Sequence, residues 1–121
     1  MIVVITAEAE ADLEQIAAYV AEQSPRSAVT LVRALRERCE SLLDAPRGYP
    51  LVPRYEHLGI RRRPFGRFLI FYRLSQDAIE VIHILHGARM PGAGHSRHPA
   101  FEIAARGRRL ATVASIVLAA Q

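Results

Sequence analysis

The fold is decided by the stretch GIRRRPFGRFLIFYRL at residues 59–74, which a short SQD break joins to AIEVIHILHGAR at residues 78–89. Both runs are rich in β-branched and aromatic residues, and turn residues divide them. The break at residues 75–77 is short enough for an antiparallel hairpin. The two runs therefore predict neighbouring strands of one sheet, with arginines at the strand ends.

Side chains alternate between the two faces of a strand, and both faces of these runs are largely apolar. In the first run, one expected face carries Phe68, Ile70, Tyr72 and Leu74, and the other carries Leu69, Phe71 and Arg73. In the second run, one expected face carries Ile79, Val81, His83 and Leu85, and the other carries Glu80, Ile82, Ile84 and His86. Such runs indicate central strands that are covered on at least part of both faces.

The N-terminal part predicts a short strand and two helices. The strand is the β-branched run 2–5, and Thr6 after it is a candidate N-cap. The first helix has its apolar residues at helical spacing, and we expect Glu10, Asp12 and Glu14 to face away. Ser24-Pro25 starts a second helix, whose apolar stripe includes Cys39 as a core residue.

The resulting order of strand, helix, helix and three strands predicts an α+β fold. The helices form an antiparallel hairpin on one face of a mainly antiparallel sheet. Residues 47–50 and Pro53 are expected to be loop, and the helices to cover one face only, which leaves the other face with arginines near its rim. Pro64 cannot donate to a strand ladder, so it marks an edge, a bulge or a turn.

We divide the chain into a domain at residues 1–90, a linker at 91–100 and a C-terminal extension at 101–121. The linker is predicted from its glycines and prolines, and the extension is expected to be helical. The extension either docks on the sheet and inhibits in cis or is a separable appendage. One cysteine, no secretory leader and no apolar run of ~20 residues favour the cytoplasm and exclude a membrane span.

Charge is unevenly distributed along the chain. All 16 basic residues are arginines, the formal net charge is +4, and an acidic first part precedes a basic remainder. Clustered arginines bind carboxylates and phosphates through bidentate hydrogen bonds, which indicates an acidic partner. A base composition that favours arginine over lysine, with solvated strand ends, is the alternative explanation.

At this point the chain resembles the ParE/RelE toxin superfamily, and within it the ParE branch of plasmid-stabilisation toxins. The resemblance spans most of the first ninety residues and does not extend to residues 92–121. It rests on Ala9-x-x-Asp12-Leu13-x-x-Ile16-x-x-Tyr19, Ser24-Pro25, Ala28, Leu42, Pro46, Gly59-Ile60-Arg61-x-x-Pro64, Tyr72-Arg73 and His86-Gly87-Ala88-Arg89.

The resemblance implies the toxin of a type II toxin–antitoxin pair, which binds and inhibits DNA gyrase and is neutralised by a ParD-like antitoxin. No cofactor, metal or membrane partner is implied, and nucleic acid is expected to be reached only through the antitoxin complex. We assign the partner surface to the arginines Arg61, Arg62, Arg63, Arg67, Arg73 and Arg89.

Two alternatives stay open. A RelE-like ribosome-dependent mRNA endoribonuclease needs a base, an acid and cationic stabilisation of the phosphorane. Arg61, Arg89 and His86 are the candidates for that site, but the chain lacks lysine and has no tyrosine after Tyr72. His83 is expected to be a hydrogen-bonded core residue instead. The second alternative is an inactive homologue that only binds antitoxin.

Overall fold

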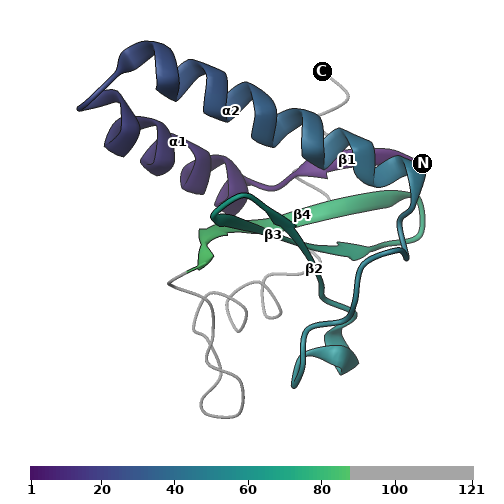
Figure 1. The fold of residues 1–121 in the computed structure, drawn as a ribbon. Coiled ribbons are helices and arrows are strands. Elements are labelled where there is room, and N and C mark those ends of the chain that lie inside the picture. Colours follow the sequence, from purple (N-terminus) through teal and green to yellow (C-terminus); the bar gives the residue numbers. More distant parts are fainter. Residues whose placement is uncertain (88–121) are drawn as a thin grey trace.

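The computed structural model describes residues 1–87. The linker and C-terminal extension that we predicted after residue 90, and Arg89, lie outside this range. The described chain contains strands, α-helices and two short 3₁₀ helices (Figure 1). In order they are β1 (Ile2–Ile5), α1 (Ala7–Ala21), α2 (Pro25–Glu40), η1 (Ser41–Asp44), η2 (Glu56–Leu58), β2 (Arg61–Phe65), β3 (Phe68–Leu74) and β4 (Ala78–His86).

Both helices begin at the capping residues that the sequence indicates. The Thr6 side-chain oxygen accepts a hydrogen bond from the Ala9 N–H at 3.2 Å, and the Ser24 oxygen accepts one from the Ser27 N–H at 3.2 Å. Pro25 occupies the first turn of α2, where its missing N–H costs nothing. Local chemistry is therefore sufficient to fix the starts of α1 and α2.

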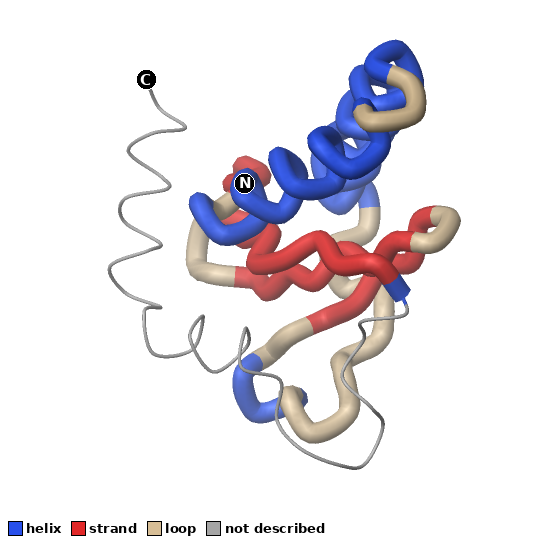
Figure 2. The backbone as a smooth tube through the Cα atoms, turned by 90° about the vertical axis from the view of Figure 1, so that its left-hand side faces the viewer, coloured by secondary structure: helices blue, strands red, loops and turns tan. Residues whose placement is uncertain are grey.

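The sheet has the strand order β1-β4-β3-β2. β1 pairs parallel with β4, whereas β4, β3 and β2 pair antiparallel. The helical hairpin covers one face (Figures 1 and 2). The predicted α+β arrangement, a mainly antiparallel sheet with α1 and α2 on one face, is confirmed. Pro64 lies within β2, an edge strand, as its missing N–H requires.

The core has two parts, one on each side of the sheet. The helix-side cluster joins Leu13 and Leu35 to Ile70 and Tyr72 of β3. A second cluster contains Phe71 and Ile82 together with residues that precede β2, namely Val52, Tyr55 and Ile60. The strands are therefore covered on both faces, as their apolar runs predict, and the cover opposite the helices comes from residues before β2, part of which were expected to be loop.

A β-bulge changes which residues of β4 share a face. Phe71 pairs with His83 and Tyr72 pairs with Val81, so Ile82 is an extra residue on β4. Beyond the bulge, Ile84 joins the helix-side cluster and Leu85 packs with the second one. The strict alternation predicted for residues 79–86 is therefore wrong after Ile82.

Candidate functional site

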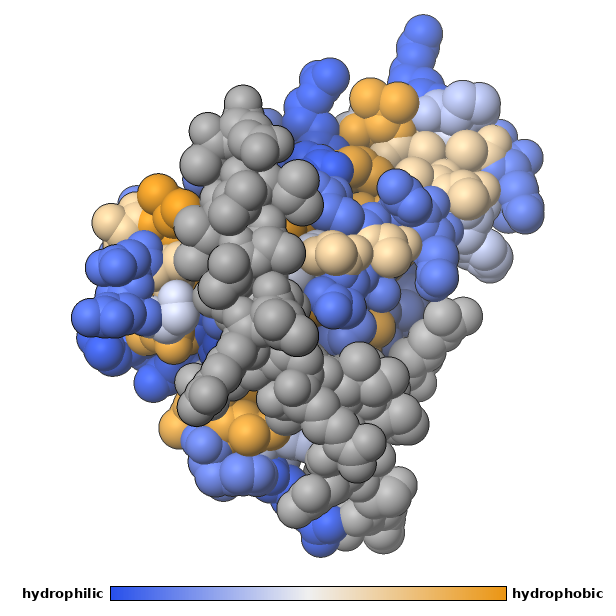
Figure 3. All heavy atoms as spheres, turned by 180° about the vertical axis from the view of Figure 1, so that it is seen from behind, coloured by the Kyte–Doolittle hydropathy of each residue, from blue (hydrophilic) through white to orange (hydrophobic). Residues whose placement is uncertain are grey.

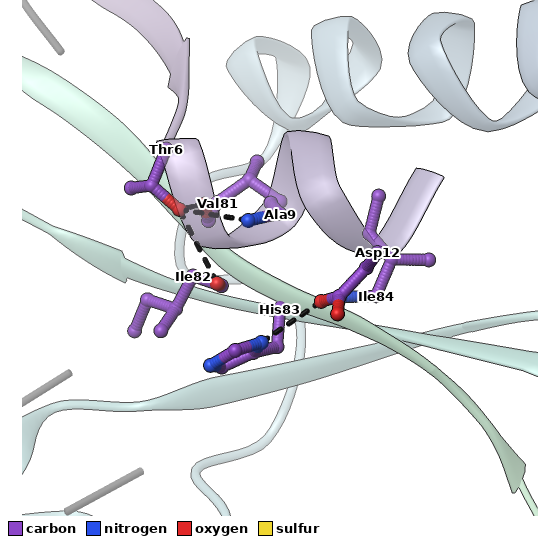
Figure 4. Close-up of polar contacts among 7 residues, drawn as sticks. All are labelled: Thr6, Ala9, Asp12, Val81, Ile82, His83 and Ile84. Atoms are coloured by element: carbon purple, nitrogen blue, oxygen red, sulfur yellow. Dashed lines mark hydrogen bonds and ion pairs between the residues drawn. The ribbon is translucent and has the colours of Figure 1, made fainter. Parts of the chain in front are cut away.

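The junction of α1 and β4 carries a dense set of polar contacts (Figure 4). One carboxylate oxygen of Asp12 accepts from the Ile84 N–H at 2.9 Å and lies 2.8 Å from His83 Nδ1. The Thr6 hydroxyl lies 2.7 Å from the Val81 carbonyl oxygen. Thr6 thus bonds the last β4 residue that β1 pairs, and Asp12 of α1 bonds the two β4 residues 83 and 84 beyond that pairing.

Two expectations are decided at this junction. His83 is buried and hydrogen-bonded, as predicted. The expectation that Asp12 faces away from the sheet was wrong, because its carboxylate bonds the main chain of β4. Sequence periodicity misses this role, because Asp12 lies next to the apolar stripe of α1 at a position where an exposed polar residue is expected.

Arg61 and Arg63 lie two residues apart on β2 and hold the chain before β2 in place. Arg61 Nη1 donates to the Tyr49 carbonyl at 2.7 Å and to the Arg47 carbonyl at 3.4 Å. Arg63 Nη1 donates to the Arg38 carbonyl at 2.7 Å, near the C-terminal end of α2, and to the Ser41 hydroxyl. Cationic donors suit this position, because a helix C-terminus presents unpaired carbonyls.

Aromatic rings lie beneath the guanidinium groups of Arg63 and the neighbouring Arg38. The Arg63 guanidinium lies 5.1 Å from the centre of the Tyr49 ring, and the Arg38 guanidinium lies 4.9 Å from that of Phe65. Tyr49 also makes an edge contact with Tyr72, whose hydroxyl donates to the Pro46 carbonyl at 2.8 Å. Burial raises the pKa of the Tyr72 phenol, although Arg61 and Arg63 nearby act in the opposite direction.

The remaining predicted arginines have different environments. Arg62 is half-buried, and Arg67 is exposed in the turn between β2 and β3. Arg73 is buried, and its Nε donates to Glu80 Oε1 at 2.8 Å across β3 and β4. The structure thus brings Arg61 and Arg63 together and places Arg73 inside the fold.

An apolar groove runs along the helical hairpin. Small side chains from both helices form it, and Val29 beside them is 59% exposed. Charged residues of α2 border it, and Arg36 makes a bidentate pair with Glu10 of α1 at 2.7 and 3.1 Å. In Figure 3 the hairpin, at upper right, shows a pale apolar surface among hydrophilic residues. The lining residues are Ala17, Ala18, Ala21, Pro25, Ala28, Val29, Val32, Arg33, Arg36, Glu37 and Glu40.

Comparison with known proteins identifies the family to which this fold belongs. The profile described as "ParE toxin of type II toxin-antitoxin system, parDE" matches residues 3–91. The chain belongs to the ParE toxin family. A solved structure titled "Chromosomal ParDE TA system from P. aeruginosa" is similar, with 25% identity and a TM-score of 0.60 over 71% of this chain and 95% of that one. No curated protein matches the chain.

Membership of the ParE family implies a ParD-like antitoxin as partner. Among residues 1–87, no helix has the length and apolar character that crossing a bilayer requires.

Cys39, predicted as core, is fully buried, and desolvation raises the pKa of its thiol to about 12. This thiol is therefore neutral and packs as a small apolar group.

Of the residues suggested for a nuclease, Arg61 and His86 lie apart, and Arg89 is outside the described residues. Arg61 pairs with Tyr72, while His86 pairs with Phe68, at the other end of β3 and on its other side. Four residues along β3 and two strand spacings separate their main chains by about 13 Å and about 10 Å in the two directions. The His86 ring packs edge-on against Phe68, with the ring centres 5.6 Å apart.

Proposed function

We propose that this ParE-family chain is a toxin that acts by binding, with DNA gyrase as its target, and that a ParD-like antitoxin neutralises it. The observation that supports the proposal is the placement of the candidate binding and catalytic residues among residues 1–87. Arg61 and Arg63 bond main-chain carbonyls or a hydroxyl, Arg73 is paired with Glu80, and His86 lies far from Arg61. These placements favour a binding surface over a general acid–base site.

The antitoxin surface that we propose is the groove on the helical hairpin. Its alanine floor lets another backbone approach closely, and an amphipathic helix that fills such a groove buries its apolar face. The polar border formed by Arg33, Glu37 and Glu40 fits the rim of a protein interface. The exposed Val29 supplies an apolar contact within the groove.

The test is a supercoiling assay with purified gyrase, run beside a ribosome-dependent mRNA cleavage assay. We expect the chain to prevent supercoiling, to leave mRNA intact, and to lose its effect when its ParD-like antitoxin is added. Cleaved mRNA with normal supercoiling would instead establish the endoribonuclease. No effect in either assay, with antitoxin still bound, would establish the inactive homologue.

A pair of variants locates the antitoxin in the same experiment. Val29→Asp places a charge in the groove, so we expect at least a tenfold loss of antitoxin affinity with gyrase inhibition retained. Leu43→Asp is the matched control, because Leu43 is an exposed apolar residue outside the groove lining. Equal affinities of the two variants for antitoxin would place the antitoxin elsewhere.

A further inference from the structure

Four arginines gather where the C-terminal end of α2 meets the edge strand β2. We name them the edge arginine patch: Arg38, Arg47, Arg61 and Arg63. The hydrogen bonds of Arg61 and Arg63 connect them, since the acceptors include the main-chain carbonyls of Arg47 and Arg38. Arg38 and Arg47 are exposed, whereas Arg61 and Arg63 are half-buried.

The patch keeps its positive charge. In residues 1–87 the ion pairs with Asp or Glu involve Arg36, Arg73 and His83, and none involves the patch. The acceptors that Arg61 and Arg63 use are neutral carbonyls and a hydroxyl, which orient a guanidinium without cancelling its charge. Each guanidinium has five N–H donors, and these bonds use only Nη1, so donors remain for a partner.

Rings and main-chain carbonyls hold three of the four guanidinium groups, those of Arg38, Arg61 and Arg63, in place before any partner arrives. Tyr49 contributes both a ring beneath Arg63 and a carbonyl for Arg61, and Phe65 lies beneath Arg38. A guanidinium stacked on a ring keeps its N–H edge available for a planar carboxylate. Fixing the side chains in advance also lowers the entropy lost on binding.

We propose that the edge arginine patch binds an acidic, extended polypeptide segment of the toxin's target. Arg61 and Arg63 share one face of a strand at i and i+2, which spaces them by about 6.7 Å. An extended segment with Asp or Glu at alternate positions presents carboxylates at the same spacing. Recognition is through side chains, because Pro64 and the Arg62 N–H bond to the Pro50 carbonyl leave little of this edge open for backbone pairing.

The surroundings favour a short peptide over nucleic acid. Glu37, Glu40 and Asp44 are exposed on α2 and η1, each within three residues of Arg38 or Arg47 in the chain. A duplex carries one charge per ~1.7 Å of its axis and would meet these acids as it continued beyond the patch. A segment of a few residues avoids them, so the charge pattern selects a local acidic motif.

Two variants of equal net charge test the proposal, which rests on the proposed function only for the identity of the target. Arg38→Gln with Arg47→Gln removes two charges from the patch and leaves the main-chain carbonyls in place. Arg26→Glu removes the same net charge from an exposed position at the start of α2. Thermal unfolding and antitoxin affinity are measured for both, to show that fold and groove are intact.

The first readout is inhibition of gyrase supercoiling. We expect the double variant to need at least fivefold more protein than wild type for half-inhibition, and Arg26→Glu to stay within twofold. Equal inhibition by the double variant and wild type would overturn the proposal while the gyrase function stands. If wild type does not inhibit gyrase, the proposed function fails, and the patch is judged by the second readout.

The second readout is fluorescence anisotropy with a labelled twelve-residue peptide of alternating Glu and Ser, with the Gln-Ser peptide as control. We expect wild type and Arg26→Glu to bind the Glu peptide, and the double variant to bind at least fivefold more weakly. Binding that is equal in all three proteins overturns the proposal. The same assay is run with a labelled twelve-base-pair duplex. If the double variant loses more affinity for the duplex than for the Glu peptide, the patch binds nucleic acid and the proposal is overturned.

Discussion

Arg73 on β3 and Arg63 on β2 belong to one sheet, but they differ in burial and in what their charges bond. Arg73 is 4% exposed and bonded to a carboxylate of β4, so its charge is neutralised inside the fold. Arg63 lies at the edge and bonds a carbonyl and a hydroxyl, so it orders the loop and keeps its charge. Strand order decides the difference, because β3 is central and β2 has one open side.

The difference shows that arginines close in sequence need not belong to one binding surface. Charge that is matched by a buried carboxylate contributes to specificity of the fold, whereas charge held by neutral acceptors remains available to a partner. We therefore expect substitutions at Arg73 or Glu80 to act on stability. Substitutions in the edge arginine patch should act on binding, with a smaller effect on stability where the side chain also bonds the main chain.

Breaking the buried pair should have the largest effect. Glu80→Ala leaves the Arg73 charge buried without its carboxylate, which typically costs ~3–5 kcal/mol of unfolding free energy. Urea denaturation followed by circular dichroism measures this loss. Arg73→Met with Glu80→Leu should recover most of it, because two apolar groups replace both charges. A loss below about 1 kcal/mol in Glu80→Ala would contradict the pairing, because an unpaired buried charge typically costs several times more.

Removing one edge arginine should have a smaller effect. Arg63→Met deletes the bonds to the Arg38 carbonyl and Ser41, and we expect a loss of ~1–2 kcal/mol, as for hydrogen bonds from a partly exposed charged donor. Arg47→Met is the control, since only its main-chain carbonyl is bonded, and should stay within ~0.5 kcal/mol. Equal losses in the two variants, by the same denaturation assay, would show that Arg63 has no particular structural role.

The smallest effect concerns Tyr72, which lies beside the edge arginines. Burial raises the pKa of its phenol above the ordinary value of 10.0, so the fold favours the protonated form. The resulting stability is fully present below pH 10 and is lost as pH rises through the folded-state pKa. Tyr72→Phe also lacks the bond to the Pro46 carbonyl, which contributes ~0.5–1.5 kcal/mol.

Unfolding curves between pH 8 and pH 11 therefore distinguish the two contributions of Tyr72. We expect the variant to be less stable than wild type at pH 8 and the gap to narrow above pH 10, the ordinary phenol value. A gap that does not change with pH would show that the phenol has the same pKa in the folded and unfolded chain.

Local signals in the sequence determined a large part of this protein. Thr6 and Ser24-Pro25 start the helices, the β-branched runs form the strands, and Pro64 lies at an edge. These features depend on neighbours in the chain, such as a side-chain oxygen three residues before an N–H, so they can be identified without the fold. The order of these elements was also enough to predict the fold class, and the resemblance carried by residues 9–89 to predict the ParE family.

Tertiary structure decided what depends on partners distant in sequence. Asp12 bonds β4 more than seventy residues away, a bulge reverses the faces of β4 after Ile82, and residues 52–60 cover the second face of the sheet. The separation of Arg73 from Arg61 and Arg63 has the same origin. Strand order and the carboxylate of Glu80 determine where each charge lies, and neither can be read from arginines spaced along one chain.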